Sequence, residues 1–117
     1  MPANLSKRKN IFSALPIESL NDEVTEILLE NKQVKLERII TTGQTTPKGQ
    51  WYDQDHDEWV ILLKGEASIL FEDGDEVHLQ SGDYILIKAH QKHRVNWVAP
   101  HEVCVWLAVF FSSNSNT

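Results

Sequence analysis

The chain has 117 residues with 11 basic against 17 acidic side chains, and its net charge of −6 argues against nucleic acid as the main partner. This length, with a hydrophobic fraction of 41%, suits one globular domain that buries its own core. No apolar run reaches the length of a membrane span, and the N-terminus has no apolar core of signal-peptide length, so we expect a cytoplasmic protein with no membrane partner. The single cysteine, Cys104, lies in an apolar run and is expected to fill core space rather than act as a nucleophile.

The N-terminal residues are polar and predict an arm ahead of the folded domain. We expect the arm in residues 1–22, a β-barrel in residues 23–112 and a disordered tail in residues 113–117. Residues 10–15 within the arm are compatible with one short helical turn, which Pro16 would end.

The barrel begins with a predicted hairpin. Residues 24–29 and 34–40 are strand-like, the second run alternates apolar and polar side chains, and residues 31–33 are enough for a turn. A helix over residues 24–29 is the competing prediction. Residues 41–50 are rich in Gly, Pro and Thr, which is typical of a loop.

Six further strand signals follow at short spacing, and four of the five gaps between them contain Gly or Pro. They cover residues 58–63, 67–72, 76–79, 84–88, 94–98 and 103–111. The strongest turn signal is Asp73-Gly74, because this pair accepts the backbone angles of a tight hairpin. Many short strands with regular turns predict an all-β fold, either a sandwich or a small barrel.

Two of these runs, residues 59–63 and 103–111, are apolar on both faces. Successive side chains of a strand point to opposite sides, so both sides need cover. Trp59, Ile61 and Leu63 would point outward, against either the N-terminal segment or another subunit. We therefore expect a homodimer.

Polar side chains precede the first of these runs. Glu58, Val60 and Leu62 share one face of the predicted strand, and the same alternation adds His56 and Gln54 to it. A carboxylate that points into an apolar interior is costly unless it is paired, protonated or bound to a metal. Imidazole with carboxylate is a ligand set of Zn, Mn, Ni and Fe(II) sites.

These residues resemble the cupin superfamily, whose first motif is written G-x5-H-x-H-x3,4-E-x6-G. Glu58 and Gly65 stand at the spacing of E-x6-G. In the second motif, G-x5-P-x-G-x2-H-x3-N, Gly82 and His93 match. The positions that depart are Lys88, His90 and Trp97. The resemblance covers about residues 40–111 and implies a double-stranded β-helix, or jelly-roll, barrel, as in small single-domain cupins that are mostly uncharacterised.

The histidine pair of the first motif is missing. The shorter spacing places Tyr52 and Gln54 at its positions, the longer spacing Trp51 and Asp53, and His56 lies two positions out of register.

The resemblance implies a divalent transition metal (Zn, Fe, Mn or Ni) and a small-molecule ligand inside the barrel. The candidate metal ligands are Glu58, His93, Gln54 and His56, and the candidate substrate-binding residues are Tyr52, Asp53 and His90. Simpler roles stay open: a hydrogen-bonded Glu58–His93 pair, a loop position for His56, and a turn-orienting role for His90.

Two functions follow as expectations. One is a metal-binding cupin with a small-molecule pocket, which would permit a metal-dependent reaction of unassigned type. The other is a non-catalytic module that binds or senses a small ligand, with or without metal. The missing histidine pair slightly favours the second, because fewer strong ligands hold a metal less firmly. A metal-free structural barrel is a third, weaker alternative.

Overall fold

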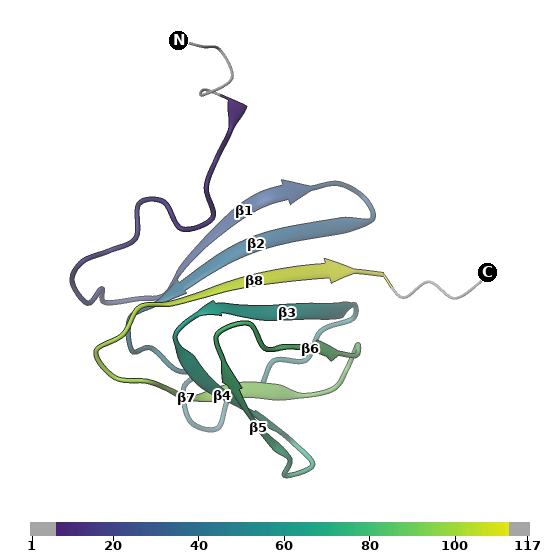
Figure 1. The fold of residues 1–117 in the computed structure, drawn as a ribbon. Coiled ribbons are helices and arrows are strands. Elements are labelled where there is room, and N and C mark those ends of the chain that lie inside the picture. The colour runs from purple at the N-terminus through teal and green to yellow at the C-terminus, as the bar shows by residue number, and fades with distance from the viewer. Residues whose placement is uncertain (1–6, 113–117) are drawn as a thin grey trace.

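The computed structural model describes residues 7–112, and its elements are eight β-strands (Figure 1). They are β1 (Val24–Glu30), β2 (Val34–Thr41), β3 (Asp57–Lys64), β4 (Glu66–Phe71), β5 (Glu76–Gln80), β6 (Tyr84–Ile87), β7 (His93–Val98) and β8 (Cys104–Phe111). A five-stranded sheet has the order β1-β2-β8-β3-β6, and a three-stranded sheet has the order β5-β4-β7. All named pairings are antiparallel, which confirms the predicted all-β jelly-roll barrel.

The predicted hairpin at the start of the barrel is confirmed, and residues 24–29 form a strand instead of a helix. Its turn is closed by the Asn31 side chain, whose Oδ1 accepts hydrogen bonds from the backbone N–H of Gln33 at 2.8 Å and of Val34 at 3.0 Å. In the arm, residues 11–14 form a turn in which Ser13 N donates to Asn10 O at 3.0 Å. The predictions for residues 1–6 and 113–117 lie outside the described residues.

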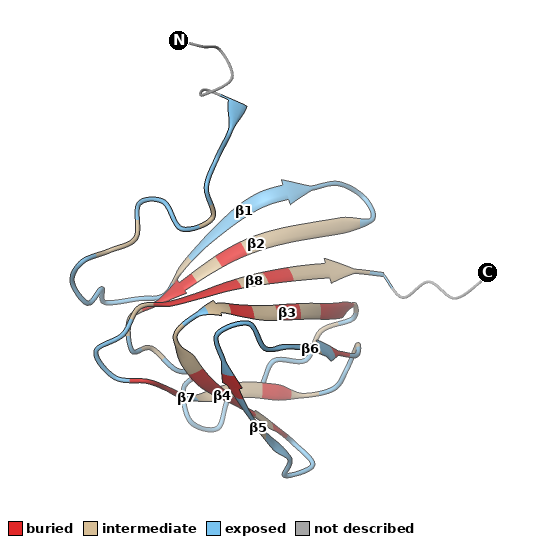
Figure 2. Cartoon of the chain, viewed as in Figure 1, coloured by how far each residue is buried: buried red, intermediate tan, exposed pale blue. Residues whose placement is uncertain are grey.

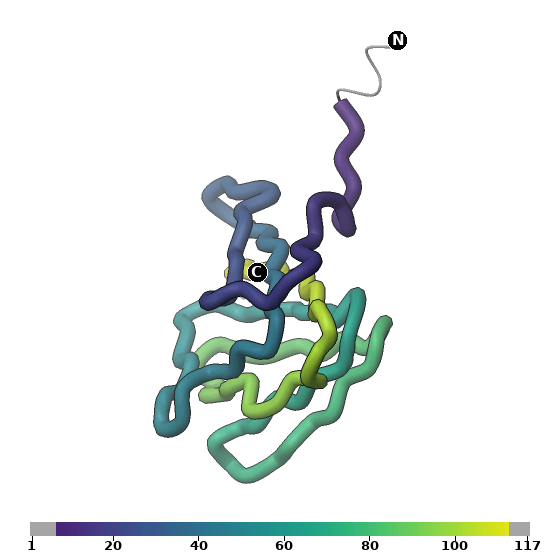
Figure 3. The backbone as a smooth tube through the Cα atoms, turned by 90° about the vertical axis from the view of Figure 1, so that its left-hand side faces the viewer, coloured from purple at the N-terminus to yellow at the C-terminus, as the bar shows by residue number. Residues whose placement is uncertain are grey.

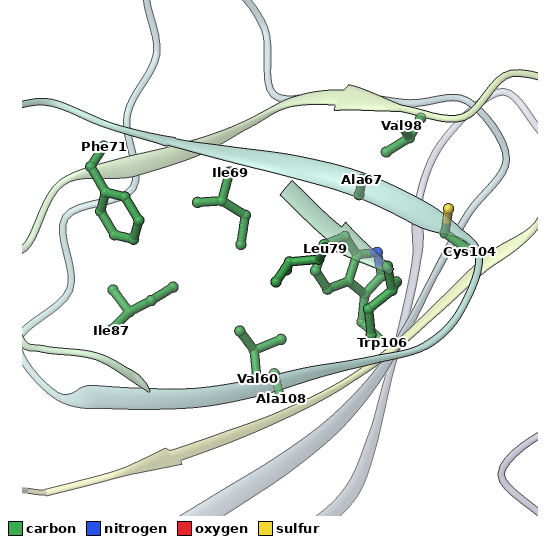
Figure 4. Close-up of a cluster of buried hydrophobic side chains, with 11 residues drawn as sticks. Val60, Ala67, Ile69, Phe71, Leu79, Ile87, Val98, Cys104, Trp106 and Ala108 are labelled. Atoms are coloured by element: carbon green, nitrogen blue, oxygen red, sulfur yellow. The ribbon is translucent and has the colours of Figure 1, made fainter. Parts of the chain in front are cut away.

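The main core lies between the two sheets. Figure 4 shows Ile69 and Phe71 of β4 pointing across to Val60 of β3 and Ile87 of β6. Leu62 and Cys104 are fully buried in the same cluster, so the prediction of a core role for the cysteine agrees with its position. Along β3, buried residues alternate with less buried ones, as Figure 2 shows. Among residues 7–112, no helix is long and apolar enough to cross a membrane.

A second buried layer lies on the outer face of the five-stranded sheet. Ile40 of β2 and Val105 of β8 are buried, are paired across the two strands, and do not belong to the main core cluster. The neighbouring Arg38 side chain donates from Nη1 to the carbonyl oxygens of Ile11 at 2.9 Å and Ser13 at 2.7 Å. Part of the outer face is therefore tied to the N-terminal segment that leads into β1 (Figure 3).

The glycine that matches the first cupin motif has a steric role. Gly65 joins β3 to β4 with φ of +100°, and a Cβ built there would lie 2.5 Å from Cys104 Sγ and 3.0 Å from Cys104 Cα. Because the second contact is with backbone, no side-chain rotation relieves it. Gly74, in the β4–β5 hairpin, has a similar φ of +102° but no atom within 4 Å of the corresponding Cβ position.

We expect Gly65→Ala to destabilise the protein by about 3–5 kcal/mol, since it adds a clash to the strain of a positive φ. Gly74→Ala is the matched control and should cost about 1–2 kcal/mol, from backbone strain alone. Denaturant unfolding of both variants measures the difference. Equal losses of stability would show that the approach of Cys104 to Gly65 is unimportant.

Candidate functional site

A cavity of about 860 Å³ opens between the two sheets. Its lining comes from both sheets and from the loop that precedes β3. Its apolar lining residues are Ile39, Val60, Ile69, Ile87, Val95, Trp106 and Phe110. Its polar lining residues are Glu23, Thr25, Lys35, Glu37, Thr41, Tyr52, Asp53, Gln54, Asp55, His56, Glu58, His90 and His93.

A polar cluster of three side chains lies inside this cavity. Glu58 is the first inward residue of β3, and only 8% of it is exposed. Its Oε1 accepts a hydrogen bond from Gln54 Nε2 at 3.1 Å, and the same oxygen lies 3.6 Å from Nε2 of His93, on the opposite sheet. The structure thus brings together three residues that the sequence singled out.

The orientation of His93 determines what this cluster offers to a ligand. Its Nδ1 lies 3.0 Å from the carbonyl oxygen of Gln91. A carbonyl can only accept, so Nδ1 carries the hydrogen, and a neutral ring turns an unprotonated Nε2 toward the Glu58 carboxylate. Two acceptors that face each other at 3.6 Å favour a proton, a donor group or a cation between them.

The other two candidate histidines are held apart from this cluster. His56 lines the cavity, but its Nδ1 pairs with Asp55 Oδ1 at 2.9 Å and its ring meets Phe110 edge-on at 5.4 Å. His90 has a positive φ of 64°, and its backbone N–H donates to Gln54 O at 2.7 Å. Its Nδ1 lies 2.9 Å from Asp53 Oδ1, so His90 orients the loop between β6 and β7 against the loop before β3.

The metal ligand set is therefore incomplete. Within residues 7–112, no group of three or more His, Cys, Asp or Glu side chains is arranged to hold a metal ion. The distance between Glu58 Oε1 and His93 Nε2 suits two ligands of one divalent ion, each at about 2.1 Å from it. A third protein ligand would have to be the amide oxygen of Gln54, a weaker donor than the missing histidine.

Tyr52 forms one side of the cavity beside the cluster. Its backbone makes an isolated antiparallel bridge with His93, and the two rings lie 5.5 Å apart. Burial raises the pKa of the Tyr52 phenol, and the nearby Glu23 and Glu58 carboxylates raise this pKa further, while a hydrogen bond with Thr46 lowers it. The phenol therefore stays protonated at neutral pH and can donate a hydrogen bond into the cavity.

The cavity residues of β1 and β2 were missed by sequence reasoning. Lys35, Glu37, Ile39 and Thr41 alternate along β2 and line the cavity, while the even-numbered positions face outward. The alternation was visible in the sequence, but it does not tell which face of the strand points inward. Here the face with more charge points toward the cavity, and Arg38 on the other face donates hydrogen bonds to the arm.

The phenol of Tyr52 can be titrated alone in Tyr84→Phe, because the chain contains two tyrosines. We expect ultraviolet difference titration to give a Tyr52 pKa above that of free tyrosine, and Glu23→Gln to lower this pKa by removing a repelling charge. Glu102→Gln, a surface change of the same charge outside the cavity lining, should leave it unchanged. A Tyr52 pKa at or below that of free tyrosine would contradict the described surroundings.

Comparison with known proteins places this barrel and cavity in a family. Residues 38–110 match the family Cupin_2, described as a cupin domain. The chain is 40% identical to a protein from Ralstonia eutropha JMP134 named "putative mannose-6-phosphate isomerase". This similarity covers 91% of the chain and 98% of the Ralstonia protein, with a TM-score of 0.86.

More distant structures share the fold. A cupin superfamily protein from Desulfitobacterium hafniense DCB-2 is 18% identical over 92% of this chain and 93% of its own, with a TM-score of 0.72. The structure of FeII HppE is 16% identical over 76% of this chain and 50% of its own, with a TM-score of 0.66. No curated protein matches the chain. From the matched family and the 40% identical relative, the chain belongs to the cupin superfamily.

Proposed function

We propose that this cupin binds a small molecule in the cavity between its sheets and that it does so without needing a metal ion. The observation that carries this proposal is the cavity of about 860 Å³, which combines apolar side chains from both sheets with polar groups that converge at Glu58. Such a combination is typical of small-ligand sites, in which apolar walls supply affinity and a few polar groups fix orientation.

Glu58, Gln54 and His93 would orient the ligand. The Glu58 carboxylate accepts hydrogen bonds, and so does Nε2 of a neutral His93 ring, so the two groups favour a ligand with donor groups such as hydroxyls or amines. The protonated phenol of Tyr52 adds a donor at the side of the same cluster. These roles for Glu58, Gln54, His93 and Tyr52 are part of the proposal.

A thermal-shift screen of small metabolites, followed by calorimetry on each hit, tests ligand binding. Removing the Glu58 charge in Glu58→Gln should weaken binding about tenfold, the equivalent of one charge-assisted hydrogen bond. Glu102→Gln should leave affinity unchanged. Hits that bind Glu58→Gln as tightly as the wild type would show that the ligand lies elsewhere.

A metal-dependent function is the second candidate, and the 3.6 Å approach of Glu58 and His93 is the observation in its favour. Glu58, His93 and the Gln54 amide oxygen would hold the ion, and His56 would have to leave Asp55 to join them. A bound divalent ion would supply a Lewis acid for the ligand. The donor set described above fits this alternative less well than it fits a metal-free site.

We expect protein purified without added metal to contain less than stoichiometric metal, and chelation to leave its melting temperature and ligand affinity unchanged. Elemental analysis, repeated after incubation with Fe(II), Mn, Ni or Zn, measures the content. Stoichiometric metal that is lost in both Glu58→Ala and His93→Ala would establish the second candidate in place of the first.

The outer face of β3 and β6 is the proposed contact of a homodimer. Trp59, Ile61 and Leu63 alternate with core residues and are only partly buried, while Tyr84 and Leu86 of the edge strand are 61% and 48% exposed. The rings of Trp59 and Tyr84 lie 5.2 Å apart. This face is continuous and apolar, and a second copy of the chain can cover it symmetrically.

Light scattering of the wild type is expected to give the mass of a dimer. Leu86→Glu should give a monomer, because it places a charge within the proposed contact. Ile17→Glu, at an exposed apolar position of the arm, is the matched control and should remain dimeric. A monomeric wild type, or a dimer that persists in Leu86→Glu, would exclude this contact.

A further inference from the structure

One wall of the cavity carries two polar groups that lack partners. This β1–β2 wall consists of Glu23, Thr25, Glu37, Ile39 and Thr41. The register pairs Val24 with Ile40 and Thr25 with Ile39, so Glu23, the residue before β1, lies opposite Thr41 on the same face. Both residues line the cavity.

The hydroxyl of Thr41 is the first of these groups. Thr41 is 2% exposed, and its Oγ1 has no hydrogen-bond partner among the described residues. A buried hydroxyl without a partner costs about 1–3 kcal/mol of stability. Oγ1 has almost no accessible surface, so this cost strains the wall and does not offer a contact to a ligand.

The carboxylate of Glu23 is the second group. Within residues 7–112, no side chain or backbone group donates a hydrogen bond to it or pairs with it as an ion. Burial raises the pKa of Glu23, and the charge of Glu37 raises it further. Glu23 is itself an exposed residue of the cavity lining. Lys35 does not compensate Glu23, because its Nζ lies 3.2 Å from Glu37 Oε2.

The cavity lining as a whole carries more acidic than basic side chains. Among the described lining residues, five bear carboxylates and one, Lys35, bears an ammonium group. The carboxylates are Glu23, Glu37, Asp53, Asp55 and Glu58. Charges that line a cavity with low-dielectric walls act on a ligand more strongly than the same charges in water, so this lining attracts cations and repels anions.

We infer that the ligand of this cavity is an organic cation, a protonated amine whose ammonium group binds Glu23 while its carbon body packs on Ile39 and Trp106. Ile39 pairs with Thr25, two residues after Glu23, and Trp106 is the direct partner of Ile39 on β8, so the register places both near Glu23 in the cavity lining. The inference rests on the proposed function, since it names the ligand class of the same cavity. It also separates this chain from a protein that takes a sugar phosphate, because a phosphate dianion would meet five carboxylates.

Calorimetry with sets of three matched ligands tests which ligand charge the cavity prefers. The three members of a set share a carbon body and differ in one group, which is an ammonium, a hydroxyl or a phosphate. One trio is mannosamine, mannose and mannose 6-phosphate, and another is benzylamine, benzyl alcohol and benzyl phosphate. Within a trio the ammonium member should bind at least tenfold more tightly than the hydroxyl member, and the phosphate member most weakly. Glu23→Gln should weaken binding of the ammonium member about tenfold and leave the hydroxyl member unchanged.

Two variants serve as controls for Glu23→Gln. Glu102→Gln removes the same charge from a surface turn and should change no affinity. Thr41→Val removes the unpartnered hydroxyl at almost constant volume, so it should raise the melting temperature and leave ammonium binding unchanged, because Oγ1 is not exposed to the cavity.

Glu23→Gln should also melt slightly higher than the wild type at neutral pH. The folded protein raises the pKa of Glu23, so the stability that its protonated form contributes is present at low pH and lost as the pH rises through the raised pKa. Neutral glutamine avoids this loss. The melting temperature therefore shows that the variant is folded.

The outcomes separate this inference from the proposed function. Tightest binding of a phosphate or a hydroxyl member, or an ammonium preference that survives Glu23→Gln, would overturn the inference while leaving small-molecule binding intact. Binding of no member of any trio, together with no hit in the metabolite screen, would overturn both.

Discussion

A buried carboxylate on the inner face of β3 sets the constraint on which the site depends. Glu58 shares its face with Val60 and Leu62, which fill the core, so its charge lies at the boundary between packed interior and open cavity. Such a carboxylate must find polar neighbours. Gln54 supplies one from the loop before β3 and His93 another from the opposite sheet. The polar contacts of Glu58 thus join a loop and both sheets at one end of the barrel.

The same boundary explains why this end of the barrel stays open. Beyond Val60 and Leu62 the two sheets pack apolar side chains against each other, and the space closes. Around Glu58 the lining alternates carboxylates, imidazoles and amides with apolar residues, and these cannot collapse onto one another without losing hydration. An open cavity therefore costs less free energy than a collapsed one. Its negative lining makes the cavity prefer cationic ligands to anionic ones.

Side chains alternate between the inner and outer face in both β2 and β3, but the inner faces of the two strands carry different residue types. In β3 the inward face is almost entirely apolar after Glu58, so its orientation follows from hydrophobic burial. In β2 the inward face holds Lys35 and Glu37, while the outward face holds Arg38 and the buried Ile40. The arm stabilises this orientation, because the backbone carbonyl oxygens of Ile11 and Ser13 accept hydrogen bonds from the outward Arg38 side chain. Covering an outer face from the N-terminal side thus frees the inner face for polar groups.

The sequence by itself determined the strands, the turns between them and the placement of Glu58 on an inward face, because period-two burial and glycine-containing turns are local properties. It also singled out Gln54 and His93, which the fold brings to Glu58. Only the tertiary structure decided that His56 turns to Asp55, and that Glu23 and Thr41 both line the cavity. Those outcomes depend on register, on loop conformation and on which face of β2 the arm covers, and these are set by contacts between residues distant in the chain.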